Sequence, residues 1–109
     1  MNNIIVKQAG LSEIDTVAAL FDLYRQFSGK ETNLNEARSF LLERFNHGES
    51  VIFIAYLNSN PVGFTQLYPS FSSASLGRIF ILNDLYVVGE ARKLGKAHKN
   101  ITANQIFLN

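Results

Sequence analysis

The chain has 109 residues, of which 47% are hydrophobic and 17% charged, with a net charge of +1; this indicates one packed domain over residues 1–109. The near-neutral charge gives no general electrostatic reason for binding nucleic acid or an anionic membrane, and the lack of cysteine excludes disulfides, thiolate nucleophiles and cysteine-based zinc sites. Two histidines are too few for a histidine-rich metal site, and neither a membrane-length apolar run nor a signal peptide is evident, so we expect a soluble, cytoplasmic protein without a bound metal.

The first half of the chain predicts a strand followed by two helices. Residues 3–8 form a short β-rich run, which favours a strand. Ser12 followed by Asp15 resembles a capping box and predicts the start of a helix. Asn33 followed by Glu36 repeats this signal. The apolar positions that recur at helical spacing in the two segments are Ile14, Val17, Ala18, Phe21, Tyr24, Ala37, Phe40, Leu41 and Phe45.

Three strand-like segments follow, at residues 51–57, 62–68 and 78–88. A turn-forming run separates the first two, and a polar connection over residues 69–75 separates the second from the third. A helix-like stretch begins at about Arg92. Strands joined by short connections favour an antiparallel meander, because a parallel pair needs a long crossover. The predicted fold class is α/β of the mixed α+β type, in the order β-α-α-β-β-β-α.

The last strand leads into a turn rich in cations and glycine. Such a turn opens a helix whose first N–H groups lack partners and carry partial positive charge, which suits a phosphate. Gly95 allows the backbone to approach a ligand closely, and Arg92, Lys93 and Lys96 add positive charge. The combination favours a pyrophosphate site, although a solvated helix face is the alternative for the charged run.

Strand and turn together resemble motif A of the GNAT (Gcn5-related) N-acetyltransferase superfamily, whose pyrophosphate loop follows the pattern Q/R-x-x-G-x-G/A. Arg92, Gly95 and Ala97 match it, directly after a strand reading Asp84-Leu85-Tyr86-Val87. The resemblance implies the N-terminal half of a GNAT fold that uses acetyl-CoA as co-substrate. It assigns main-chain contacts with the pantetheine arm to Leu85, Tyr86 and Val87, and contacts with the pyrophosphate to Arg92, Lys93, Leu94, Gly95, Lys96 and Ala97.

The resemblance also implies that an unprotonated amine attacks the thioester while a base or a water chain removes its proton. Asp84 is the candidate base because it is the only carboxylate on its strand; a solvated carboxylate near a strand kink is the alternative. Tyr24, Phe27 and Phe71 are candidates for the wall of the acceptor pocket, with core packing as the alternative for the two helical aromatics. The expected acceptor is a small amine or an amino group.

Members of this family have a second half, with further strands, a helix and a tyrosine that protonates the leaving thiolate. The sequence ends at Asn109, before that half, so we expect residues 78–88 to form an exposed apolar edge strand. We expect a homodimer or larger homo-oligomer that buries this edge. The alternatives are a fragment of a longer product, or a truncated, inactive remnant that self-associates as an interaction module. Nucleic-acid binding through residues 92–99 is disfavoured, because one short basic cluster offers few phosphate contacts.

Overall fold

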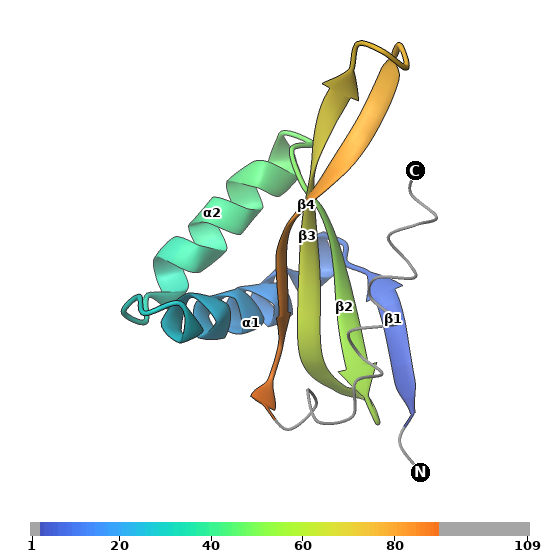
Figure 1. Ribbon diagram of the computed structural model, residues 1–109. Coiled ribbons are helices and arrows are strands. Elements are labelled where there is room, and N and C mark those ends of the chain that lie inside the picture. The colour runs from blue at the N-terminus through green and yellow to red at the C-terminus, as the bar shows by residue number, and fades with distance from the viewer. Residues whose placement is uncertain (1–2, 90–109) are drawn as a thin grey trace.

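A four-stranded antiparallel sheet carries two helices on one face in the computed structural model, which describes residues 3–89 (Figure 1). In chain order the elements are β1 (Ile4–Gln8), the 3-10 turn η1 (Leu11–Glu13), α1 (Ile14–Phe27), α2 (Leu34–Asn46), β2 (Val51–Leu57), β3 (Asn60–Ser72) and β4 (Gly77–Val87). The sheet order is β1-β2-β3-β4. The predicted α+β class and antiparallel meander are confirmed, whereas the helix expected from about Arg92 lies outside the described residues.

The helix starts are set by local polar contacts, and one of them differs from the prediction. The Asn33 side chain accepts a hydrogen bond from the Glu36 amide at 3.2 Å, as the capping signal before α2 predicted. The capping box predicted at Ser12 is wrong, because Ser12 lies inside η1. The Gly10 N–H instead donates to the Glu13 carboxylate at 2.7 Å, so Gly10 is the N-cap and the helical segment begins at Leu11.

The core lies between the two helices and the sheet. Val17 of α1, Leu41 of α2 and Phe64 of β3 are its fully buried centre, and burying each such side chain contributes roughly 1.5–3 kcal/mol to folding. A smaller apolar cluster lies on the other face of the sheet, around Ala55 and Val87. The larger cluster, which joins residues of both helices to β2 and β3, is what holds the helices on the sheet.

The hairpin of β3 and β4 is longer than predicted and projects beyond the rest of the sheet (Figure 1). The sequence indicated a strand over residues 62–68 and a polar connection after it, but β3 continues to Ser72. Pairing with β2 ends at Leu67, so beyond that point β3 has β4 alone as its neighbour. Pro69 is tolerated there because proline, which lacks an N–H, can occupy a strand with a free side.

A bulge at Asn83 decides which way the inner half of β4 faces. Gln66 pairs with Asp84 while the next residue, Leu67, pairs with Leu82, so Asn83 has no partner across the ladder. In a ladder without the bulge, Asn83 would lie opposite Gln66 and Asp84 would face the other side of the sheet. The extra residue therefore turns the carboxylate of Asp84 toward the helix-covered face.

Candidate functional site

The carboxylate of Asp84 is the buried end of a hydrogen-bonded chain. Asp84 is 7% exposed, and its Oδ2 accepts a hydrogen bond from Gln66 Nε2 at 2.9 Å. Gln66 Oε1 in turn accepts from the hydroxyl of Ser50 at 2.7 Å. The Thr65 hydroxyl donates to the main-chain carbonyl of Asp84 at 2.8 Å. Since the amide of Gln66 donates on one side and accepts on the other, the chain fixes the orientation of the carboxylate.

An open groove of about 320 Å³ leads to this carboxylate. Its lining residues come from α1, the α1–α2 connection, α2, β3 and β4; they are Phe21, Tyr24, Arg25, Ser28, Lys30, Phe40, Tyr68, Asn83 and Asp84. The α1 members recur at the i, i+3, i+4, i+7 spacing of a single helix face. A second hollow of about 260 Å³ adjoins the groove and shares Phe21, Arg25 and Phe40 with it.

Two tyrosines in the groove stay protonated at neutral pH. Burial raises the pKa of Tyr24, and the negative charge of Asp84 raises it further. Burial also raises the pKa of Tyr68; Asp84 adds to this effect and Arg44 opposes it. The Tyr24 hydroxyl also hydrogen-bonds to the Asp84 carboxylate, so its oxygen remains to accept from a bound molecule.

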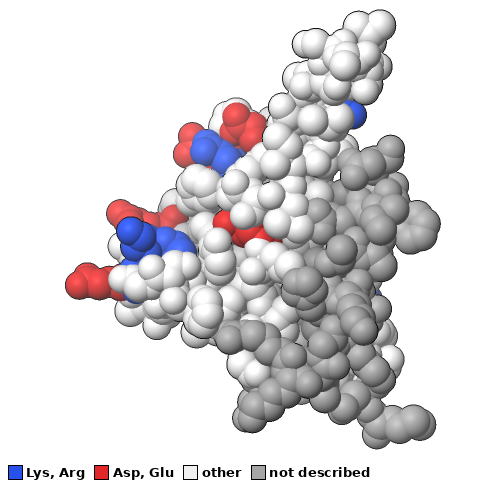
Figure 2. All heavy atoms as spheres, in the orientation of Figure 1, with Lys and Arg blue, Asp and Glu red and all other residues white. Residues whose placement is uncertain are grey.

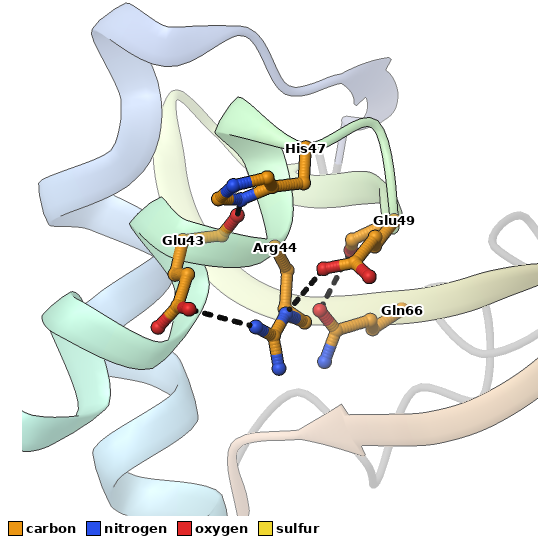
Figure 3. Close-up of polar contacts among 6 residues, drawn as sticks. Glu43, Arg44, His47, Glu49 and Gln66 are labelled. Carbon is orange, nitrogen blue, oxygen red and sulfur yellow. Dashed lines mark hydrogen bonds and ion pairs between the residues drawn. The ribbon is translucent and has the colours of Figure 1, made fainter.

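A charged cluster lies where α2 ends, behind the groove. Arg44 forms ion pairs with Glu49 at 3.0 Å and with Glu43 at 3.4 Å, and its guanidinium lies 5.1 Å from the centre of the Phe40 ring. Figure 3 shows its side chain between the two glutamates, with Gln66 of β3 beside it. The positive charge of Arg44 is thus partly compensated from within the cluster.

Asp22 ties the end of α1 to the start of α2. Its Oδ1 accepts from the Asn33 amide at 2.8 Å, and its Oδ2 accepts from the Thr32 hydroxyl at 2.5 Å and from Gln26 Nε2 at 3.1 Å. These hydrogen bonds, with Thr32 first and Asn33 next, lower the pKa of the Asp22 carboxyl. The contacts anchor the connection that brings Lys30 to the mouth of the groove.

The structure brings some of the sequence-predicted site residues together and leaves others apart. Asp84 and Tyr24 both line the groove. Phe27 is 67% exposed at the end of α1, and its ring centre lies 6.0 Å from that of Tyr86. Phe71 is 74% exposed on the projecting hairpin, where its ring lies 5.6 Å from the guanidinium of Arg78. Phe71 is not part of the groove lining.

The residues predicted to hold the cofactor are only partly described. Leu85, Tyr86 and Val87 are the last three residues of β4 and follow the bulge directly. The predicted pyrophosphate contacts, Arg92, Lys93, Leu94, Gly95, Lys96 and Ala97, lie outside the described residues.

Sequence reasoning missed Gln66, Ser50, Tyr68 and Arg25. A glutamine between Thr65 and Leu67 in an apolar strand was an available signal, because a buried amide requires partners on both of its ends. The other three carry no sequence signal of their own, since Arg25 enters the site through the packing of α1, Ser50 through the loop before β2 and Tyr68 through the extension of β3.

Among residues 3–89, no group of three or more histidine, cysteine, aspartate or glutamate side chains is arranged to hold a metal ion. Over the same range, neither α1 nor α2 combines the length and apolarity that spanning a membrane requires.

The chain resembles bacterial acetyltransferases in sequence. It is 46% identical over 98 residues to YhfO of Bacillus subtilis (strain 168), named as an uncharacterized N-acetyltransferase; the match covers 90% of the chain and 66% of YhfO. It is 36% identical over 81 residues to a "probable acetyltransferase" of Haemophilus influenzae, covering 73% of the chain and 56% of that protein. The chain thus spans about two thirds or less of the length of these relatives. No family model matches it.

Solved structures give the same result. The crystal structure of a "probable acetyltransferase" superposes with a TM-score of 0.81 at 44% identity, covering 94% of the chain and 70% of that protein. Two structures of lower identity share the fold. A GNAT family acetyltransferase of Staphylococcus aureus has a TM-score of 0.77 at 15% identity, over 95% of the chain and 76% of that protein. A predicted acetyltransferase of Clostridium acetobutylicum, solved with acetyl-CoA, has a TM-score of 0.66 at 13% identity, over 94% of the chain and 75% of that protein.

Proposed function

We propose, since the chain belongs to the GNAT acetyltransferases, that it binds acetyl-CoA and transfers the acetyl group to a primary amine of a small acceptor. The observation that carries this proposal is the oriented carboxylate of Asp84 in the wall of an open groove. The acetyl-CoA bound to the Clostridium acetobutylicum protein, which shares the fold, supports the choice of co-substrate.

In the proposed reaction the groove holds the acceptor and Asp84 acts as the base. The lone pair of the amine attacks the thioester carbon, the new C–N bond forms and the C–S bond breaks. The proton leaves the amine nitrogen for Asp84, directly or through one water. CoA departs as the thiolate and takes its proton from solvent water. The phenol oxygens of Tyr24 and Tyr68 can position the amine by accepting its N–H groups, which leaves the nitrogen lone pair free to attack.

The cofactor is proposed to lie beyond the bulge, along the inner half of β4. Main-chain groups of Leu85, Tyr86 and Val87 would hold the pantetheine arm, and the amides of residues 92–97 would hold the pyrophosphate at a helix start. The adjacency of Asp84 to Leu85 supports this arrangement, because it sets the candidate base next to the proposed path of the thioester.

The test is acetyl-CoA binding by isothermal titration calorimetry, followed by release of the CoA thiol with a panel of primary amines. Asp84→Asn keeps the size of the side chain and removes the base, so we expect kcat/KM to fall roughly 10²- to 10⁴-fold while acetyl-CoA binding persists. Asp15→Asn is the matched control, because Asp15 is an exposed carboxylate of α1 that pairs with Arg38 outside the groove. Absence of both binding and thiol release would refute the proposal, and unchanged turnover in Asp84→Asn would refute the role of Asp84.

A second candidate is the inactive remnant that self-associates through residues 78–88. Exposed apolar side chains on this edge strand favour it, because Ile79, Ile81 and Leu82 all remain partly open to solvent, and such an edge invites pairing with another chain. Light scattering after size exclusion measures the mass. Ile81→Lys should turn a dimer into a monomer, whereas a monomeric parent at high concentration would contradict this candidate.

A further inference from the structure

We infer that the acceptor carries an anionic group besides its amine, as amino acids and short peptides with a free carboxylate do. The inference rests on the proposed function and names the substrate class of the same groove. Its starting point is the pair of cations, Arg25 and Lys30, that lines the groove together with Asp84.

Arg25 is a partly buried cation whose guanidinium has no ion-pair partner among residues 3–89. The three hydrogen bonds that the nearby carboxylate of Asp22 accepts come from other groups. These bonds, with Thr32 first, lower the pKa of the Asp22 carboxyl, and the charge of Arg25 adds to that effect. Glu36 lines the adjoining hollow with Arg25, and no ion pair joins them. A guanidinium without an ion-pair partner can offer two parallel N–H donors to a carboxylate.

Arg25 and the carboxylate of Asp84 line the same groove from different elements. Burial and then the negative charge of Asp84 raise the pKa of Tyr24, and Arg25 is the next residue of α1. The cations therefore come from α1 and the α1–α2 connection, whereas the carboxylate comes from β4. Figure 2 shows basic and acidic atoms side by side over the α1–α2 junction at the left, and a separate group of acidic atoms toward the middle.

Part of the groove wall is apolar. The rings of Phe21 and Phe40 stack with centres 5.8 Å apart, and both line the groove. An acceptor that places its amine at Asp84 and its carboxylate at Arg25 would cover this wall with its carbon skeleton. An amine without the anion would leave Arg25 solvated and would gain nothing from it.

The experiment compares matched acceptors that differ only in the anion. Each amino acid or dipeptide with a free carboxylate is assayed for CoA release beside its C-terminal amide, at the same concentration of unprotonated amine and the same ionic strength. A charge-assisted hydrogen bond corresponds to about tenfold in affinity or more. We therefore expect amidation to lower kcat/KM about tenfold, mainly by raising KM.

Variants assign the effect to the cations. Arg25→Gln should abolish the preference for the carboxylate over the amide, and Arg25→Lys should restore part of it. Lys30→Gln should reduce the preference two- to threefold, because Lys30 is more exposed. Arg38→Gln is the control, since Arg38 pairs with Asp15 and does not line the groove. Thermal melting of each variant reports whether it is folded.

The outcomes separate the inference from the proposed function. Transfer to amines with equal rates for acids and amides refutes the inference and leaves the acetyltransferase proposal intact. A carboxylate preference that survives Arg25→Gln in a folded variant also refutes it. Binding of acetyl-CoA without transfer to any amine refutes the proposed function itself.

Discussion

Replacing Gln66 tests how the orientation of Asp84 is maintained. Gln66→Leu removes the donor to the carboxylate and the acceptor of the Ser50 hydroxyl, while both partners stay buried. A hydrogen bond to a charged group contributes about 1.5–3 kcal/mol, and an unsatisfied buried hydroxyl costs about 1–3 kcal/mol. Because leucine adds some apolar burial, we expect a net loss of about 3 kcal/mol in the free energy of unfolding.

Urea denaturation followed by circular dichroism measures this loss. In a domain of this size each kcal/mol lowers Tm by roughly 4–8 °C, so thermal melting should fall by about 15 °C. Ser50→Ala removes only the outer bond and should cost about 1 kcal/mol. Gln8→Leu, at an exposed position on β1, is the matched control and should change little.

The reasoning also predicts a pH dependence for a charged variant. Gln66→Glu sets a second carboxylate beside Asp84, and the repulsion raises the pKa of the introduced carboxyl. Stability should then be retained at low pH and lost as the pH rises through that raised value. A loss below about 1 kcal/mol for Gln66→Leu, or a pH-independent Gln66→Glu, would show that the chain of hydrogen bonds does not hold the carboxylate.

Three further predictions concern the groove walls and the sheet. Asp22→Ala should lower the free energy of unfolding by about 2–4 kcal/mol in urea denaturation, because three donors lose their acceptor. Since the pKa of Asp22 is lowered, its contribution to stability should vanish as the pH falls below about 4. If Asp22→Asn lost stability in acid as steeply as the parent does, this would be contradicted. Tyrosinate absorbance should show Tyr24 ionising above its ordinary pKa of 10.0. In Asp84→Asn the pKa of Tyr24 should move back toward that value. A titration that Asp84→Asn leaves unchanged would show that the charge of Asp84 does not act on Tyr24. Gly63→Ala should lower Tm, because a Cβ there would lie 2.8 Å from the main-chain oxygen of Tyr86, and a Tm equal to that of the parent would show that the strands can move apart.

The helices and the strand order were predictable because local signals decide them. The apolar spacing of Val17 and Phe21 identifies one face of α1, and the asparagine cap before α2 forms as expected. The length of β3 was not predictable in the same way. Pro69 and the serines around it are typical of a loop, and only the absence of β2 beside them lets the strand continue.

The candidate site was predictable at one residue and not in its surroundings. Asp84 stood out as a carboxylate in an apolar strand. Its orientation depends on a competition with Asn83 for the place opposite Gln66, which tertiary packing decides. The place of Arg25 was equally hidden, because a lone arginine on a helix most often faces solvent, and only the fold sets this one in the wall of the same groove as Asp84.

Asn83, the unpaired residue of β4, divides the long hairpin into an inner and an outer part. The inner part is held by Gln66, Asp84 and the core. The outer part pairs only within the hairpin and ends in the turn around Leu76. Changes of length at that tip would alter pairing in the outer part and be absorbed before they reached the carboxylate. The tip is therefore where a tag or fluorescent label can be inserted without displacing the groove.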